Sequence, residues 1–278
     1  MTTSEQAPVK TSKAGRNLPA ALAVGLSLGG VILGTLYSPY RWTFVLVLLL
    51  AGFVGTWEIV RALRTLGANP PALPLYVGGA AMVVLAYREG STQLFLGLAL
   101  TVLAMVVWRV ADPAEGVLRD LTAGVFTAAY VPFLMGFAAL LTVPSDGAER
   151  VTTFVATVVC SDVGGYVAGV LFGKHPMAPS VSPKKSWEGF VGSAVGCSLA
   201  GAIFFWSFFD ASPVLGVVYG LAVVASATLG DLGESMIKRD IGVKDMGTLL
   251  PGHGGLMDRL DSLLPTAPIA WLMLTAFV

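Results

Sequence analysis

The residues that could carry chemistry are concentrated in the last third of the chain, where charged side chains interrupt apolar sequence. Asp231 and Glu234 are three residues apart, and so are Asp258 and Asp261. Residues at this spacing share one face of a helix. Mg²⁺ usually takes one or two carboxylates together with waters and substrate phosphates. The two acidic pairs therefore indicate a metal site, whereas either pair alone would be read as a solvated helix end with ordinary salt bridges.

The segment between the two acidic pairs is basic and rich in glycine. A lysine or an arginine binds phosphate through its charge, and a glycine lets backbone N–H groups approach a phosphate oxygen. We therefore expect a polyphosphate to bind beside the metal. The candidate contacts in this segment, with the arginine that follows it, are Ser235, Lys238, Arg239, Lys244, His253, Gly254, Gly255 and Arg259.

A further acid, Asp162, follows Ser161 about halfway along an apolar run at 151–172. An ionised carboxylate at that depth in a membrane is costly and normally faces a polar cavity or a partner. Gly164 and Gly165 come next and allow a helix or a ligand to approach closely. We expect Ser161 and Asp162 to contact substrate. The alternative is a structural aspartate paired with a neighbouring helix.

The loop at 173–188 carries three lysines and one tryptophan. Lys184 and Lys185 are candidates for a clamp on a triphosphate or on a lipid head group, because lysine is a flexible point charge that suits phosphate. The alternative is a positively charged cytoplasmic loop in which Trp187 anchors the chain at the membrane interface. The residues of this loop do not decide between the two.

The composition shows that most of the chain does not face water. Hydrophobic residues make up 55% of the 278 positions, charged residues only 12%, and the mean hydropathy is +0.77. Soluble domains carry about 25% charged residues. The net charge is zero, which argues against a nucleic-acid partner. Cys160 and Cys197 both lie in apolar runs, so neither a disulfide framework nor a thiolate metal site is expected.

The apolar runs are long enough to cross a bilayer, which takes about 20 residues. Each must be helical, because lipid offers no partner to a free peptide group. The predicted fold is all-α, a polytopic integral membrane protein with about nine transmembrane helices. The predicted segments are 18–37, 42–60, 72–87, 91–108, 121–142, 151–172, 189–209, 213–231 and 263–278.

The distribution of positive charge predicts the orientation in the membrane. With the N-terminus in the cytoplasm, fourteen of the seventeen lysines and arginines face that side, and Arg41, Arg88 and Arg150 face the other. The loops at 173–188 and 232–262 are then cytoplasmic. The chain divides into a disordered cytoplasmic tail at 1–17, N-terminal transmembrane helices at 18–150, and a catalytic transmembrane region with cytoplasmic loops at 151–278.

Taken together, these motifs resemble the signature of the phosphatidate cytidylyltransferases. The run from Ser235 to Asp261 matches that signature without a gap. The stretches at 161–166 and 182–189 are similar to two further stretches typical of the family. The resemblance is clear from about Val155 to the C-terminus, whereas the preceding helices are apolar in a way that any polytopic protein could match.

The resemblance implies a homodimeric enzyme of the bacterial plasma membrane, with membrane lipid around it and its site open to the cytoplasm. It implies that CTP and phosphatidic acid give CDP-diacylglycerol and pyrophosphate with Mg²⁺, and it allows a second cation such as K⁺. It also implies that Asp231 and Asp258 bind the metal, with Asp261 close by.

The reaction implied by the resemblance needs no general base. A phosphomonoester has a second pKa of about 6, so the phosphate of phosphatidate is already an anion near neutral pH. The difficulty is to bring two anions together, and catalysis is expected from positioning and charge neutralisation. The residues expected to act in catalysis are Asp231, Lys238, Arg239, Asp258, Arg259 and Asp261.

Two other functions fit the sequence less well. A CDP-alcohol phosphotransferase would carry an Asp-Gly-x-x-Ala-Arg motif followed by spaced aspartates, and the sequence contains no such motif. A secondary transporter would favour paired half-repeats with broken helices near the middle of the membrane. No such halves are apparent, and transport does not explain a loop that is both basic and acidic.

Overall fold

The computed structural model describes residues 18–112, 115–247, 249 and 254–278, with side chains from Gly25 onward. The predicted tail at 1–17 lies outside these residues. The helices are α1 (Leu18–Leu36), α2 (Trp42–Thr65), α3 (Ala72–Glu89), α4 (Ser91–Ala111), α5 (Val117–Ala128), η1 (Ala129–Phe133), α6 (Leu134–Leu141), α7 (Gly147–Phe172), α8 (Trp187–Phe209), α9 (Pro213–Ile241), α10 (Met257–Leu260) and α11 (Leu263–Phe277).

The all-α class and the polytopic membrane architecture are confirmed, because each of the nine predicted apolar segments is helical over most of its length. α3 is not among the helices that qualify as membrane spans by length and composition, and the part of α1 with described side chains, Gly25–Leu36, is a shorter apolar helix. The count of nine spans therefore stays a prediction. Within the described residues, seven helical segments qualify: Trp42–Thr65, Ser91–Ala111, Val117–Leu141, Gly147–Phe172, Trp187–Phe209, Pro213–Ile241 and Met257–Phe277.

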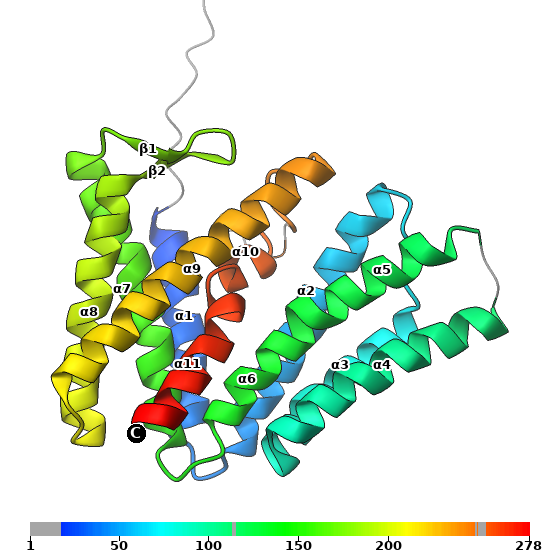
Figure 1. Ribbon diagram of the computed structural model, residues 1–278, viewed down its shortest axis with the longest axis horizontal. Coiled ribbons are helices and arrows are strands. Elements are labelled where there is room, and N and C mark those ends of the chain that lie inside the picture. The colour runs from blue at the N-terminus through cyan, green and yellow to red at the C-terminus, as the bar shows by residue number, and fades with distance from the viewer. Residues whose placement is uncertain (1–17, 113–114, 248, 250–253) are drawn as a thin grey trace, which may run out of the picture.

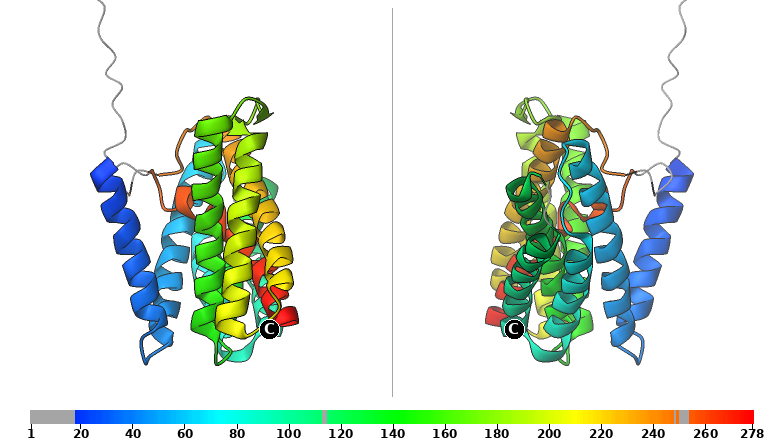
Figure 2. Two further views of the ribbon diagram at one scale, coloured as in Figure 1. Left: turned by 90° about the vertical axis from the view of Figure 1, so that its left-hand side faces the viewer. Right: turned by 90° about the vertical axis from the view of Figure 1, so that its right-hand side faces the viewer.

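The helices form two groups that meet along α6 and α11 (Figure 1). α7, α8 and α9 make up one group, and α2 to α5 make up the other. α1 stands at the margin of the bundle, as the side views show (Figure 2). The residues with candidate chemistry on these helices are Ser161 and Asp162 of α7 and Asp231, Ser235, Lys238 and Arg239 of α9.

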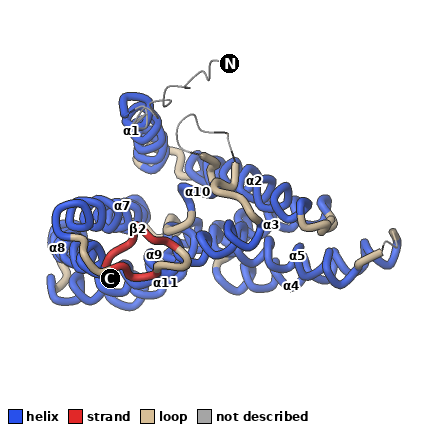
Figure 3. Tube along the Cα trace, turned by 90° about the horizontal axis from the view of Figure 1, so that it is seen from above, coloured by secondary structure: helices blue, strands red, loops and turns tan. Residues whose placement is uncertain are grey.

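The loop between α7 and α8 contains a short antiparallel hairpin, which the sequence did not predict. Its strands are β1 (Pro176–Ala178) and β2 (Ser182–Ser186), with Pro176 opposite Ser186 and Ala178 opposite Ser182. Seen from above, the hairpin lies over the ends of the helices of the α7–α9 group (Figure 3). Lys184 and Lys185 are thus on a strand rather than in an irregular loop.

α9 is longer than the sequence indicated. The predicted eighth span ends at residue 231, but the helix continues to Ile241 and ends at Gly242, whose φ of +81° is the left-handed conformation that favours glycine. The charged residues after Asp231 continue the helix because Glu234 and Lys238 are four apart and form an ion pair. Part of the predicted cytoplasmic loop at 232–262 is therefore helical.

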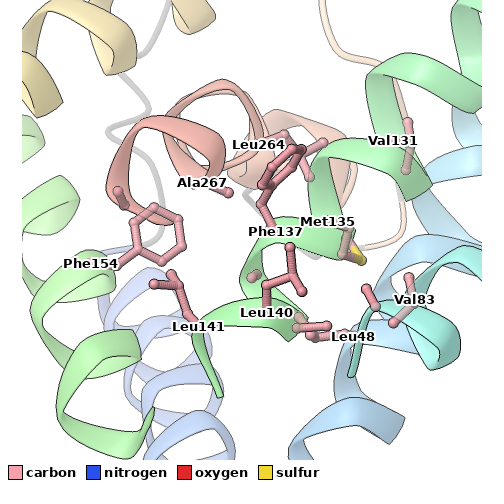
Figure 4. Close-up of a cluster of buried hydrophobic side chains, with 14 of the residues drawn as sticks. Leu48, Val83, Val131, Met135, Phe137, Leu140, Leu141, Phe154, Leu264 and Ala267 are labelled. Carbon is pink, nitrogen blue, oxygen red and sulfur yellow. The ribbon is translucent and has the colours of Figure 1, made fainter. Parts of the chain in front are cut away.

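The hydrophobic core lies where the two groups meet (Figure 4). Met135, Phe137, Leu140 and Leu141 of α6 are almost fully buried. They lie among side chains from α2, α3, α7 and α11, including Leu48, Val83, Phe154 and Leu264. Close packing of this kind holds the two groups in one fixed arrangement.

Glycines allow α7, α8 and α9 to pack backbone against backbone. A Cβ atom on Gly192 of α8 would lie 2.6 Å from the carbonyl oxygen of Gly164 in α7. A Cβ atom on Gly201 of α8 would lie 2.1 Å from the carbonyl oxygen of Gly216 in α9. Small residues at such contacts are typical of helices that associate within a membrane. This close packing fixes the relative positions of the acidic residues on α7 and α9.

Candidate active site

A polar cavity of about 510 Å³ lies between α7, α8, α9 and the hairpin. Pockets of this size are typical of small-molecule and cofactor sites. Its charged groups come from α7, β2 and α9, and α8 and Ser262 add further hydroxyl groups. Among the predicted site residues, those that line the cavity are Ser161, Asp162, Lys184, Lys185 and Asp231.

A second cavity, of about 430 Å³, lies between α2, α3 and η1. Its lining includes Leu46, Phe53, Tyr76 and Pro132, and none of its lining residues is charged. It therefore offers no charged partner to a phosphate or a metal ion. The candidate chemistry belongs to the polar cavity.

The hairpin is fixed at its base by the start of α8. The hydroxyl of Ser186 accepts a hydrogen bond from the N–H of Gly189 at 3.1 Å, which caps α8. Glu188 in the first turn accepts hydrogen bonds from the N–H groups of Lys174 and His175 at 3.1 and 3.2 Å. Its other oxygen lies 2.5 Å from Nδ1 of His175. His175 thus helps to hold the hairpin base and does not line the cavity.

Asp231 and Lys185 form an ion pair in the lining of the cavity. Nζ of Lys185 lies 2.6 Å from Oδ2 of Asp231, and both side chains are partly exposed. Asp162 on α7 interacts electrostatically with both of them and with Arg259. Asp261, which follows α10, interacts electrostatically with Asp231 and Asp162. Three carboxylates from different elements therefore share one region with two cations.

Asp258 lies in a second, more deeply buried cluster. Its Oδ1 accepts a hydrogen bond from Nζ of Lys238 at 2.8 Å. Its Oδ2 accepts hydrogen bonds from the N–H groups of Gly255 at 2.7 Å and Met246 at 3.1 Å. Nζ of Lys238 also lies 3.2 Å from Oε1 of the fully buried Glu234. Lys238 thus bridges two acids, and Asp258 holds the backbone of the segment that precedes it.

The carboxylates of the two clusters fit the chemistry of Mg²⁺, which prefers oxygen ligands. Among the described residues, no three His, Cys, Asp or Glu side chains are already grouped as the ligands of one ion. Mg²⁺ does not require three, because it usually keeps several waters and binds one or two carboxylates plus phosphates. Asp261 interacts electrostatically with Asp231, so these two acids from different elements lie near one another.

The remaining predicted residues are distributed around these clusters. Arg239 donates a hydrogen bond from Nε to the carbonyl oxygen of Val181 and so connects α9 with the turn of the hairpin. Ser235 lies 3.4 Å from Oδ1 of Asp231. Lys244 is exposed, and no contact places it in the cavity.

The glycines of the signature lie beside Asp258, but they are not free. A Cβ atom on Gly254, which has a φ of +79°, would lie 2.6 Å from Oδ2 of Asp258. The N–H of Gly255 is used by the same carboxylate. The predicted contact of these N–H groups with a phosphate stays a prediction, and His253 lies outside the described residues.

The sequence reading missed Glu58, a fully buried acid in α2. Its two carboxylate oxygens accept hydrogen bonds from the N–H groups of Leu256 and Met257. Like Asp162, Glu58 is an acid inside an apolar run, where an ionised carboxylate is costly and normally has a partner. This signal in the sequence marks Glu58 as clearly as Asp162.

Comparisons with known proteins show the family of the chain. Residues 20–277 match the model of the cytidylyltransferase family. The chain is similar to the phosphatidate cytidylyltransferase of Mycobacterium leprae, with 48% identity over 97% of this chain and 91% of that protein. It is also similar to the Mycobacterium bovis protein of that name, with 45% identity over 98% and 92% of the two chains. A chloroplastic phosphatidate cytidylyltransferase of Arabidopsis thaliana is 30% identical over 94% of this chain and 73% of its own length.

Proposed function

Because the chain belongs to the cytidylyltransferase family, we propose that it transfers the cytidylyl group of CTP to phosphatidate, giving CDP-diacylglycerol and pyrophosphate. The observation that carries the proposal is the convergence of Asp162, Asp231 and Lys185 in one cavity among membrane helices. Acids and lysines of this kind are what a site for two phosphate-bearing substrates requires. The names of the relatives supply the identity of those substrates.

In the proposed reaction, an oxygen of the phosphatidate phosphate attacks the α-phosphorus of CTP. A new P–O bond forms there, and the bond from that phosphorus to the oxygen that bridges to the β-phosphate breaks. The leaving group is pyrophosphate. The attacking phosphate carries no proton that must be removed near neutral pH. The site therefore has to align two anions and reduce their repulsion.

Lys185 and Lys184 on β2 are placed to bind phosphate oxygens, because both line the cavity. On binding, Lys185 would exchange part of its contact with Asp231 for a phosphate. Lys238 and Arg259 would supply further positive charge from the signature segment. Asp231 and Asp258, with Asp261 nearby, would hold Mg²⁺, which when bound neutralises phosphate charge.

The cavity borders an exposed apolar surface of α7. Tyr166 lines the cavity and is 74% exposed on α7. Val163, Val167 and Val170 are exposed on the same helix. Exposed apolar side chains along a membrane helix are typical of contact with acyl chains. A phosphatidate head group could thus reach the cavity while its acyl chains stay in the bilayer.

We place the protein in the bacterial plasma membrane with the cavity open to the cytoplasm. The excess of lysine and arginine on the side that carries the hairpin supports this orientation. The homodimer and the second cation that the family resemblance implies are further predictions of the proposal.

The proposal is tested with purified protein in mixed detergent and phosphatidate micelles. Pyrophosphate should be released from CTP only when phosphatidate and Mg²⁺ are both present. ATP in place of CTP, and diacylglycerol in place of phosphatidate, are the matched controls. Release of pyrophosphate without phosphatidate would contradict the proposal, and so would an equal rate with diacylglycerol.

A further inference from the structure

Glu58 connects the N-terminal helices to the signature segment of the site. It lies in α2, its side chain is fully buried, and it is nearly two hundred residues from its partners in the sequence. Oε1 accepts a hydrogen bond from the N–H of Leu256 at 3.0 Å, and Oε2 accepts one from the N–H of Met257 at 2.8 Å. Each carboxylate oxygen thus holds one backbone group of the chain immediately before Asp258.

The surroundings of Glu58 are shaped to admit its carboxylate. A Cβ atom on Gly247 would lie 2.2 Å from Oε1, and a Cβ atom on Gly255 would lie 2.6 Å from each oxygen. One turn earlier in α2, a Cβ atom on Gly55 would lie 2.9 Å from Sδ of Met257. Glycine at these three positions lets α2 and the signature segment approach closely. The contact is therefore a matched fit between two parts of the chain.

Asp258 holds the same segment from the other side. It accepts hydrogen bonds from the N–H groups of Met246 and Gly255, and it pairs with Lys238. Glu58 fixes the two residues that directly precede Asp258, so any movement of its carboxylate is transmitted to Asp258 through one or two peptide units. Lys238 would move with Asp258, because their side chains form an ion pair at 2.8 Å.

We propose that Glu58 is a positioning residue of the active site, which holds the backbone at Leu256 and Met257 so that Asp258 and Lys238 are aligned with the CTP phosphates. Glu58 touches neither substrate and acts through Asp258. This inference rests on the proposed function, because it assumes that Asp258 serves the metal and phosphate site. It gives the N-terminal half of the chain a part in the reaction that acts through the signature segment.

The test compares Glu58→Gln with the unchanged protein in detergent. Glutamine keeps the size of the side chain but offers one acceptor oxygen to two N–H donors. We expect kcat to fall at least about tenfold and the Mg²⁺ concentration for half-maximal rate to rise, with KM for phosphatidate little changed. The midpoint of thermal unfolding should change no more than in Thr101→Val, which removes another buried hydrogen bond from the N-terminal half.

Gly247→Ala tests the same contact without altering α2. Its added methyl group would displace the Glu58 carboxylate, so kcat and the Mg²⁺ requirement should change in the same direction as in Glu58→Gln. This variant carries the test if Glu58→Gln does not fold. A folded Gly247→Ala or Glu58→Gln protein with unchanged kcat and unchanged Mg²⁺ dependence would overturn the inference. The inference would also be overturned if the rate fell only in proportion to the amount of folded protein.

Asp258→Asn, measured in the same way, separates this inference from the proposed function. If Asp258→Asn is inactive while Glu58→Gln is fully active, the site assignment stands and the positioning role is wrong. If Asp258→Asn keeps more than half of the rate at saturating Mg²⁺, the assignment of Asp258 itself fails, and the positioning role fails with it.

Discussion

At the scale of single residues, the site holds its charges in pairs. Lys185 pairs with Asp231, and Lys238 pairs with Asp258. Breaking a buried or half-buried pair leaves an uncompensated charge, which costs more than the pair itself contributes. When substrate binds, a phosphate could take the place of the carboxylate beside each lysine, and the metal ion could take the place of the lysine beside each carboxylate. The paired state is therefore a suitable resting state for a site that binds both anions and cations.

The two lysines of β2 provide the prediction at this scale. Lys184→Gln and Lys185→Gln should each lower kcat/KM at least about tenfold, because a hydrogen bond to a charged group contributes about 1.5–3 kcal/mol and about 1.4 kcal/mol is a factor of ten. The loss should appear in KM for CTP if the lysines bind the triphosphate. It should appear in the phosphatidate dependence if they bind the lipid head group.

The control is the double variant Lys10→Gln with Lys13→Gln, which removes two charges from the N-terminal tail. These lysines obey the same charge rule for membrane proteins but have no part in the mechanism. The control should keep nearly the full rate once the protein is inserted. Kinetics like those of the unchanged protein for both hairpin variants would show that the hairpin is only a cytoplasmic loop.

The residue types of the site were largely predictable, but their partners were not. Asp162 could be identified as an acid within an apolar run, and Asp231 by its three-residue spacing to Glu234. The pairing of Lys185 with Asp231 depends on how the hairpin folds over α9, which no local pattern specifies. Glu58 carried the same signal as Asp162, yet its partners are backbone groups at the far end of the chain.

At the scale of elements, the glycine contacts of α7, α8 and α9 set the width of the cavity. The sequence showed the glycines and the apolar runs, from which the helices and their close approach follow. It did not show the extension of α9 to Ile241, because charged residues past Asp231 resemble a loop outside the membrane. The hairpin was missed for a related reason, since its prolines and lysines favour irregular structure.

Gly216→Ala tests the role of these contacts in stability. Its methyl group would lie 2.3 Å from the carbonyl oxygen of Gly201, so α8 and α9 must move apart. We expect the free energy of unfolding to fall by about 1–3 kcal/mol, as it does when other tightly packed sites are given an extra methyl group. Gly233→Ala on the same helix is the matched control, because nothing lies within 4 Å of its added methyl group. The midpoint temperature of thermal unfolding in detergent should be lower for Gly216→Ala than for the unchanged protein, and it should not be lower for Gly233→Ala. Equal midpoints would contradict the packing role.

At the scale of the whole molecule, the charge distribution and the structure support a proposed site at one end of the bundle. The hairpin lies at one end of α7, and the loop before α7 lies at the other (Figure 1). The long helices themselves were predictable because hydropathy and length determine them. Their grouping around α6 was not, because it depends on which apolar faces fit one another.

Cysteine labelling in intact cells tests the orientation. A cysteine at Ser180, in the turn of the hairpin, should react with an impermeant thiol reagent only after the membrane is opened. A cysteine at Ser145, in the loop before α7, should react from outside. This pattern follows from the excess of positive charge on the cytoplasmic side. Labelling of Ser180→Cys from outside would show that the orientation is the reverse of the one predicted.

The most direct test of the central claim follows the phosphorus atoms of CTP. The protein is incubated with phosphatidate, Mg²⁺ and CTP labelled with ³²P at either the α or the γ position, and the lipid is then extracted. Cytidylyl transfer predicts that the α label enters the lipid and that the γ label is released as pyrophosphate. With Asp258→Asn, neither incorporation of the α label nor release of pyrophosphate is expected. Appearance of the γ label in the lipid would show phosphoryl transfer instead, and would contradict the proposed reaction.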